Sequence, residues 1–241
     1  MLFQQIFDGL TLGMVYALIA VGYSLVFGIL RLVNFSHGSV YAFGAHIALV
    51  VAVSMQWGIF PALLISIIAT GFLGILIDKI SLKPLREKHS KPIAALITTI
   101  GISYIIQNLL MIIFGSQWFP KIFDYGIIRL GSISINSTQL FIFLVSLLLL
   151  VFLTVIIQKT KIGLAMRAVE QNSKAAHLMG INVNHVISFT FFLGGASAAI
   201  AGTLISGYYQ VVYPNMGFIA GLKAFSAAVL GGIGVLYGSV I

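Results

Sequence analysis

"QLFIFLVSLLLLVFLTVII", residues 139–157, carries no charged side chain and is long enough to cross a lipid bilayer as a helix. A hydrocarbon layer about 30 Å thick needs roughly 20 apolar residues per helix. Runs of about this length recur along the 241-residue chain, which is 60% hydrophobic and only 7% charged. The composition therefore indicates an integral membrane protein.

The positions of the charges predict an all-α, polytopic transmembrane helical bundle, because no segment shows the alternating pattern of a membrane barrel. No basic region precedes the first apolar run, so we expect this run to stay in the membrane rather than to be cleaved as a signal peptide. The predicted membrane helices are residues 6–30, 36–55, 58–78, 92–114, 139–157 and 185–207, followed by an incomplete, glycine-rich apolar segment from 216 to the end.

The basic residues predict the orientation, because short cytoplasmic loops retain Lys and Arg. An N-terminus outside the cell places only Lys121 and Arg129 on the outer face, with Lys223 unassigned. The other ten basic residues then lie inside: Arg31, Lys79, Lys83, Arg86, Lys88, Lys91, Lys159, Lys161, Arg167 and Lys174. Topology and contact with anionic lipid explain the net charge of +8, so no nucleic-acid partner is expected.

Aromatic side chains agree with this orientation. Amphipathic rings prefer the interface between membrane and water. The rings expected near the outer boundary are Trp57, Trp118, Tyr125, Tyr208, Tyr209 and Tyr213.

The polar stretch "GLAMRAVEQNSKAAHLMGI", Gly163 to Ile181, is predicted to form an amphipathic helix on the inner face. Glu170 and Lys174 form a favourable i,i+4 pair, and Gly180 suits a left-handed helix end. One interpretation is a helix that lies on the lipid headgroups. The alternative is a docking helix for a soluble partner, which is favoured by the small side chains on its apolar side. That side is formed by Ala165, Ala168, Val169, Ala176 and Met179.

The sequence disfavours an enzyme. It contains no cysteine, no H-E-x-x-H or G-x-S-x-G motif and no phosphate-binding loop, so any ATP used must be bound by another chain. His37 and His46 are nine residues apart and project in opposite directions, so they cannot share a metal. Asp8 and Asp78 are placed at the ends of predicted helices, which disfavours ion-coupled transport through intramembrane carboxylates.

Two stretches interrupt the apolar pattern: "RLVNFSHGSVYAFGAH" (Arg31 to His46) and "AVLGGIGVLYGSV" (Ala228 to Val240). Broken helices are tolerated at membrane depth where they are buried in protein or line a watery cavity. We therefore expect a solute path lined by Asn34, Ser36, His37, Gly38, Tyr41, Gly44, Gly231, Gly232 and Gly234. The alternative for the first stretch is an ordinary turn at the inner membrane surface.

Four stretches together resemble the permeases of ABC importers for branched-chain amino acids, close to the LivH type. They are residues 9–45, residues 163–181, "GGASAAIAGTL" (Gly194 to Leu204) and "GLKAFSAAVLGGIG" (Gly221 to Gly234). The resemblance implies one permease domain, residues 1–241, of the type II-like importer fold with broken helices. Relatives have eight helices and continue beyond the last glycine-rich element, so we expect this chain to be C-terminally short.

The resemblance also implies partners and a mechanism. Residues 163–181 would be the coupling helix that fits a cleft of the ATPase, through Arg167, Glu170, Lys174, Ala175, Ala176 and Gly180. Two ABC ATPase subunits, a second, LivM-like permease and a periplasmic solute-binding protein for leucine, isoleucine or valine would complete the importer in the bacterial inner membrane. No cofactor would be bound by the permease itself. The alternatives are an ABC permease for urea, short amides or another small solute, and a passive small-solute channel.

Overall fold

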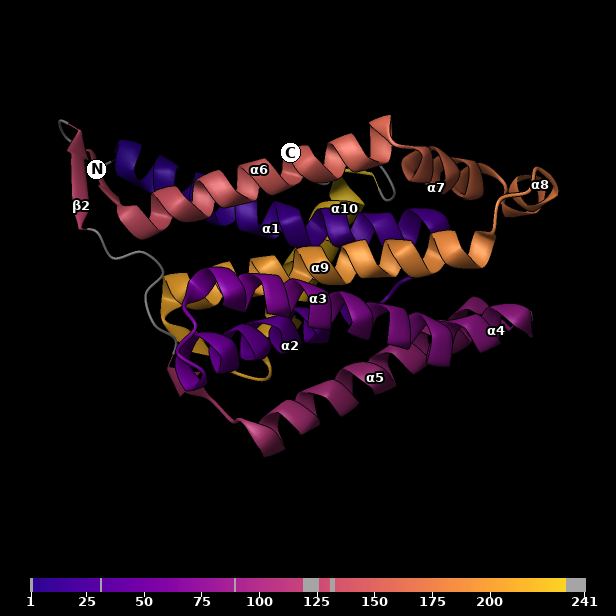
Figure 1. Ribbon diagram of the computed structural model, residues 1–241, viewed down its shortest axis with the longest axis horizontal. Helices are drawn as coiled ribbons and strands as arrows, with labels where there is room; N and C mark the ends of the chain where they lie inside the picture. The colour runs from indigo at the N-terminus through magenta and orange to yellow at the C-terminus, as the bar shows by residue number, and fades with distance from the viewer. Residues whose placement is uncertain (1, 31, 89, 119–125, 131–132, 233–241) are drawn as a thin grey trace.

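A computed structural model describes residues 2–30, 32–88, 90–118, 126–130 and 133–232, and Figure 1 shows long helices lying side by side. Six spans within these residues are long and apolar enough to cross a membrane, which confirms the predicted polytopic helical bundle. They are Gln5–Leu30, His37–Ser54, Ile59–Glu87, Pro92–Ile113, Ser137–Lys159 and Val183–Tyr209.

The elements follow one another in a simple order. The long helices are α1 (Leu2–Leu30), α2 (His37–Leu49), α3 (Ile59–Ile77), α5 (Pro92–Ile113), α6 (Ser137–Lys159) and α9 (Val183–Tyr209). The shorter helices are α4 (Lys83–Glu87), α7 (Lys161–Gln171), α8 (Ser173–Leu178) and α10 (Met216–Leu230), with π-helical segments η1 (Val50–Ser54) and η2 (Asp78–Leu82). The strands are β1 (Gln117–Trp118), β2 (Ile127–Leu130), β3 (Ile133–Asn136) and β4 (Val211–Val212).

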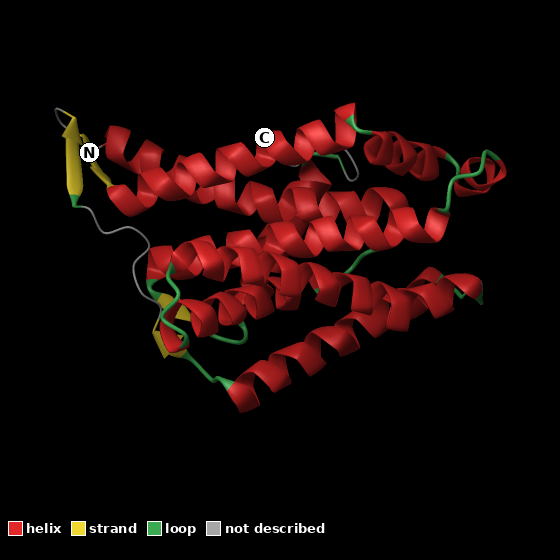
Figure 2. Cartoon of the chain, in the orientation of Figure 1, coloured by secondary structure: helices red, strands yellow, loops and turns green. Residues whose placement is uncertain are grey.

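The two ends of the bundle differ in character. Helices α4, α7 and α8 lie at the right of Figure 1, at what we name the basic end. The described basic residues of the predicted inner set lie in or beside these helices and η2. The strands lie at the opposite end, which we name the hairpin end and which Figure 2 shows in yellow. There β2 pairs antiparallel with β3, and β1 pairs antiparallel with β4. The sequence pattern did not predict these strands.

Helix α9 forms the centre of the bundle, where it packs against α1, α2 and α3. Small residues make this possible, because a side chain at Gly195 or Gly202 would overlap the backbone of α3 or α2. Gly194 likewise lies against the backbone of Gly22 on α1. Without a hydrophobic driving force in lipid, such close approach is what holds helices together. The "GGASAAIAGTL" stretch therefore accounts for the central position of α9.

Helices α5 and α6 lie at the periphery. Only 17% of the α5 span and 28% of the α6 span are buried, compared with 78% for the α9 span. Their exposed side chains are large and apolar, including Ile97, Ile105, Ile112, Leu148 and Phe152. Surfaces of this kind suit contact with lipid tails.

The beginning of α6 is fixed by a capping box. The Asn136 side chain accepts from the Thr138 N–H at 3.1 Å, and the Asn136 N–H donates to Gln139 Oε1 at 3.1 Å. Gln139 also donates to Asp8 Oδ1 at 2.9 Å. Asp8 thus links α1 to α6 at the hairpin end.

The third span is longer than predicted. The apolar pattern predicted its end at residue 78, whereas η2 and α4 continue α3 to Glu87 without a break. Asp78 is therefore internal to this span rather than terminal, and it is fully buried. The charges between Asp78 and Glu87 obscured this continuation, because they resemble those of a loop.

The close packing gives a test on Gly217. A Cβ atom at this position on α10 would overlap the Gly38 carbonyl oxygen on α2. We expect Gly217→Ala to lower the free energy of unfolding by about 2 kcal/mol, because well-packed sites resist added volume. The measurement is the temperature at which the detergent-solubilised protein loses its monodisperse peak. Gly101→Ala on α5 is the control, since a Cβ there meets open space. Equal melting of the two variants would contradict the packing argument.

Candidate functional site

The turn between α1 and α2 lies inside the bundle rather than at its surface. Asn34 and Ser36 are buried, and the Ser36 hydroxyl donates to Asn34 Oδ1 at 2.6 Å. The Phe35 N–H donates to Thr99 Oγ1 at 3.3 Å. Thr99 lies about two turns into α5 from its first residue, so α2 begins well within the depth of the bundle.

Serine contacts hold the first turn of α2 at this depth. The Ser39 hydroxyl lies 2.6 Å from the Ser103 hydroxyl on α5. Gln107, one turn further along α5, donates to both hydroxyls at 3.0 Å. Polar groups satisfied by neighbouring helices are what an interrupted membrane helix requires.

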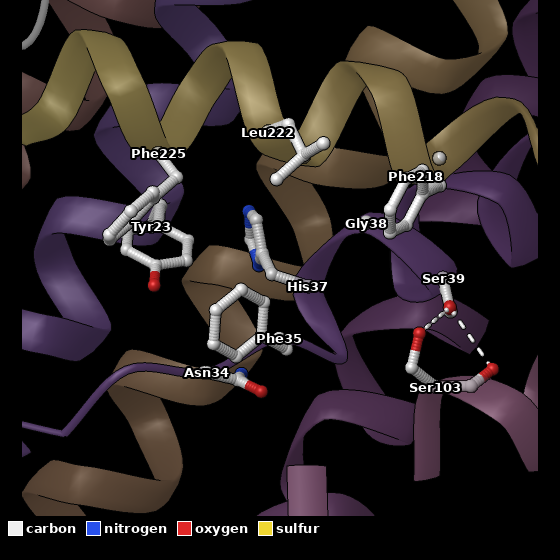
Figure 3. Close-up of a pocket in the computed structure, with 12 residues that line it drawn as sticks. Tyr23, Asn34, Phe35, His37, Gly38, Ser39, Ser103, Phe218, Leu222 and Phe225 are labelled. Carbon is white, nitrogen blue, oxygen red and sulfur yellow. Dashed lines mark hydrogen bonds between the residues drawn. The ribbon is translucent and has the colours of Figure 1, made fainter. Parts of the chain in front are cut away.

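A small cavity adjoins this turn and α10. Figure 3 shows the His37 ring among Tyr23, Phe35 and Leu222. The cavity is lined by Tyr23, Asn34, Phe35, His37, Gly38, Ser39, Ser103, Gly217, Phe218, Gly221, Leu222 and Phe225. His37 Nε2 and the Tyr23 hydroxyl are buried there with no hydrogen-bond partner among the described residues. Its volume of about 30 Å³ is roughly a tenth of that of the smallest small-molecule sites, about 300 Å³, so it is too small for an amino acid.

A larger cavity of about 310 Å³ lies nearer the hairpin end. We name it the tyrosine cavity. It is lined by Tyr16, Tyr41, Ile205, Tyr209, Val211, Tyr213, Met216, Ile219 and Ala220. Four phenol groups and several aliphatic side chains therefore meet where α1, α2, α9, β4 and α10 converge. Its volume is at the lower end of the range of small-molecule sites, about 300–1,000 Å³.

The structure separates the residues predicted to line a solute path. Asn34, His37 and Gly38 line the small cavity, and Ser36 lies beside them, where its hydroxyl donates to Asn34. Tyr41 lines the tyrosine cavity. Gly44 is in close helix contact, since a Cβ there would lie 2.5 Å from the Ala199 Cα. Gly231 and Gly232 end α10, with Gly232 at φ +89°, and Gly234 lies outside the described residues.

The polar segment, residues 163–181, forms two helices, whereas its sequence pattern predicted one. Asn172 interrupts it with an extended backbone, and its side chain accepts from the N–H groups of Lys174 and Ala175 at 3.1 and 3.0 Å. Asparagine is a favoured N-cap, so this break was present in the sequence as an unrecognised signal. The end of α8 follows the prediction, because Gly180 has φ +83°.

The residues predicted for ATPase coupling differ in how far they are exposed. Ala176 is buried, whereas Lys174, Ala175 and Gly180 are exposed. Arg167 is partly buried and donates to the Ile157 carbonyl oxygen at the end of α6. Glu170 on α7 is also partly buried.

The apolar side of this segment differs from the prediction. Met166 and Val169 on α7 are buried, and α7 packs on α1, α6 and α9. Met179, which was assigned to the same side, is instead 83% exposed, as is Leu178 at 86%. The break at Asn172 turns α8 away from the direction that one continuous helix would have taken.

A buried ionic cluster joins the third span to α9. Arg86 Nη1 lies 2.5 Å from Asp78 Oδ1, and the Ser188 hydroxyl donates to Asp78 Oδ2 at 2.9 Å. Ser188 lies near the beginning of α9, shortly after α8. The cluster therefore connects two segments at the basic end that are far apart in the sequence.

Comparison with known proteins identifies the family. Residues 5–241 match the family described as "Branched-chain amino acid transport system / permease component". The chain is 40% identical to the high-affinity branched-chain amino acid transport system permease protein LivH of Salmonella typhimurium, over 99% of this chain and 81% of that protein. Protein BraD of Pseudomonas aeruginosa, with the same description, is 38% identical over 99% and 81%.

A more distant relative extends the comparison. The probable branched-chain amino acid transport permease protein LivH of Methanocaldococcus jannaschii is 30% identical over 93% of this chain and 72% of its own length. No solved structure matches. The chain belongs to the family of branched-chain amino acid transport permeases, which confirms the resemblance found in the sequence, and it is a multi-pass membrane protein.

The ionic cluster gives a second test. We expect Asp78→Ala to cost about 3 kcal/mol of stability, because it leaves the Arg86 charge buried without its partner. Ser188→Ala, which removes one hydrogen bond, should cost about 1 kcal/mol. Denaturation in detergent measures both, and Ser226→Ala at an exposed position of α10 is the control. The stabilising role of the Asp78–Arg86 ion pair is contradicted if Asp78→Ala unfolds at the same temperature as the control.

Proposed function

We propose that this chain is a permease subunit of an ATP-driven importer for leucine, isoleucine and valine, with its basic end in the cytoplasm and its N-terminus in the periplasm. The observation that carries the proposal is the identity of 40% along nearly the whole chain to a branched-chain amino acid transport permease. Two ABC ATPase subunits, a second, LivM-like permease and a periplasmic binding protein would complete the importer.

The sequence supports the assignment of ATP hydrolysis to other subunits of this importer. It contains no phosphate-binding loop, so nucleotide would be bound and hydrolysed by the ATPase subunits. The permease would bind no cofactor of its own. The collection of basic residues beside α4, α7 and α8 supports a cytoplasmic location for this end.

The exposed face of α8 supports a docking role. Leu178 and Met179 are among the most exposed large apolar side chains, and Lys174 and Ala175 are exposed on the same short helix. An apolar helix face outside the predicted membrane spans indicates an interaction surface. We assign this face to the ATPase cleft, with Leu178 and Met179 added to the residues expected from the sequence.

The connection from α8 to α9 would convey movement to the membrane. Gly180 ends α8, and Asn182 caps α9 by accepting from the His185 N–H at 3.1 Å. Few residues therefore separate α8 from the central helix of the bundle. A displacement of α8 would act directly on α9, and through the Asp78–Ser188 hydrogen bond on the third span.

A charge on α8 tests this assignment. We expect Ala175→Asp to reduce ATP hydrolysis stimulated by the loaded binding protein about tenfold or more, because the introduced carboxylate would be desolvated in the ATPase cleft. Ser90→Asp is the matched control, since it adds the same charge at an exposed position between α4 and α5. Hydrolysis in proteoliposomes is the measurement, with co-purified ATPase determined for each variant.

Three outcomes would count against the proposal. Unchanged hydrolysis in Ala175→Asp would remove α8 from the ATPase interface. Leucine uptake at full rate without ATP would favour a passive channel. Uptake of urea or a short amide in place of leucine would replace the solute class.

A further inference from the structure

Lys223 on α10 lies beside Tyr16, which is near the middle of the first predicted membrane span on α1. Its Nζ donates to the Tyr16 hydroxyl at 3.3 Å and lies 4.8 Å from the centre of the same ring. Along α1, Tyr16 is about 16 Å from Gln5 and about 21 Å from Leu30, the two ends of the first span. The ammonium group is therefore far from both membrane surfaces.

An ammonium group at this depth does not face lipid. Charged side chains in membrane spans face the bundle interior or a watery cavity, and they mark solute pathways. Lys223 is exposed in the single chain and forms no ion pair within the part of the chain that the structure describes. Its face must accordingly be covered in the assembled transporter by something other than lipid tails.

The tyrosine cavity and this ammonium group share a residue, Tyr16. Tyr16 lines the cavity and accepts the hydrogen bond from Lys223. Ile219, one helical turn before Lys223 on α10, also lines the cavity. Val211 and Tyr213 line it close to the hairpin end. The cavity thus extends from the hairpin end toward Lys223.

We propose that the tyrosine cavity with Lys223 at its inner end is a transient binding site for an aliphatic amino acid on its way through the membrane. Lys223 would bind the carboxylate, since no acidic residue lines the cavity among the described residues. Met216 and Ile219 would contact the aliphatic side chain, and the faces of Tyr41 and Tyr213 suit the ammonium group. This inference rests on the proposed function, and it names the residues that recognise its solute.

Uptake by the assembled importer in proteoliposomes tests the role of the charge. We expect K223M to reduce ATP-dependent leucine uptake about tenfold or more, because the solute carboxylate loses its cation at membrane depth. K223R should retain a substantial part of the uptake, since it keeps the charge. S226A, one turn away on α10, should transport like the wild type. Stimulated ATP hydrolysis and the amount of co-purified partner subunits should stay within twofold of wild type in K223M.

Site-directed labelling tests carboxylate recognition directly. The chain contains no cysteine, so K223C supplies a single thiol in this subunit when the partner subunits are cysteine-free. K223C lacks the cation, so it should take up leucine as slowly as K223M before modification. Complete modification with the ethylammonium reagent should restore uptake, whereas an ethylsulfonate reagent should not.

The outcomes separate this inference from the proposed function. ATP-dependent leucine uptake by K223M within twofold of wild type would overturn the inference and leave the proposed function standing. Loss of the second permease from K223M would also overturn it, because Lys223 would then be an ion-pair partner at the subunit interface. Absence of ATP-dependent leucine uptake in the wild type would overturn the proposed function, and the inference with it.

Discussion

Close contact between backbones along α9 is the constraint on which the bundle depends. Gly194, Gly195 and Gly202 lie against α1, α3 and α2, where any larger side chain would separate the helices. In lipid, packing of this kind replaces the hydrophobic effect as the source of helix association. It also leaves the large apolar side chains of α5 and α6 free to contact the membrane. The positions of both cavities follow, because each lies where α10 meets the helices around this centre.

Polar groups inside the bundle are paired across helices rather than exposed to lipid. The turn before α2 is held by Thr99 and Ser103 of α5, and Asp78 is paired with Arg86 and Ser188. An unpaired polar group in hydrocarbon is costly, so irregular backbone requires such partners. Six buried side-chain polar atoms of the described residues have no hydrogen-bond partner, and two of these are His37 Nε2 and the Tyr23 hydroxyl. They lie together at the small cavity, beside the interrupted helix.

The membrane spans could be predicted from the sequence because hydrocarbon thickness sets a length that apolar runs display directly. The buried position of Asp78 could not, since its neighbours Lys79 and Lys83 resemble a loop and its partner Ser188 is remote in the chain. The break at Asn172 had a local signal in its N-cap, but the surrounding helical periodicity concealed it. Tyr209 and Tyr213 were assigned to the interface, and only the convergence of α1, α9 and α10 reveals the cavity between them. The coupling role came from resemblance, since periodicity alone left a lipid-surface helix open.

The junction between α6 and α7 fixes how the polar segment is attached to the bundle. A side chain at Gly163 would overlap the Ile157 carbonyl oxygen, and Arg167 donates to that same oxygen. Helix α7 is thereby clamped to α6, whereas α8 is joined through Gly180 to α9. Asn172, with φ −157° and ψ 104°, is the residue between α7 and α8. The extended backbone at Asn172 therefore separates a helix that is fixed to the lipid-facing α6 from one that is joined to the central helix α9.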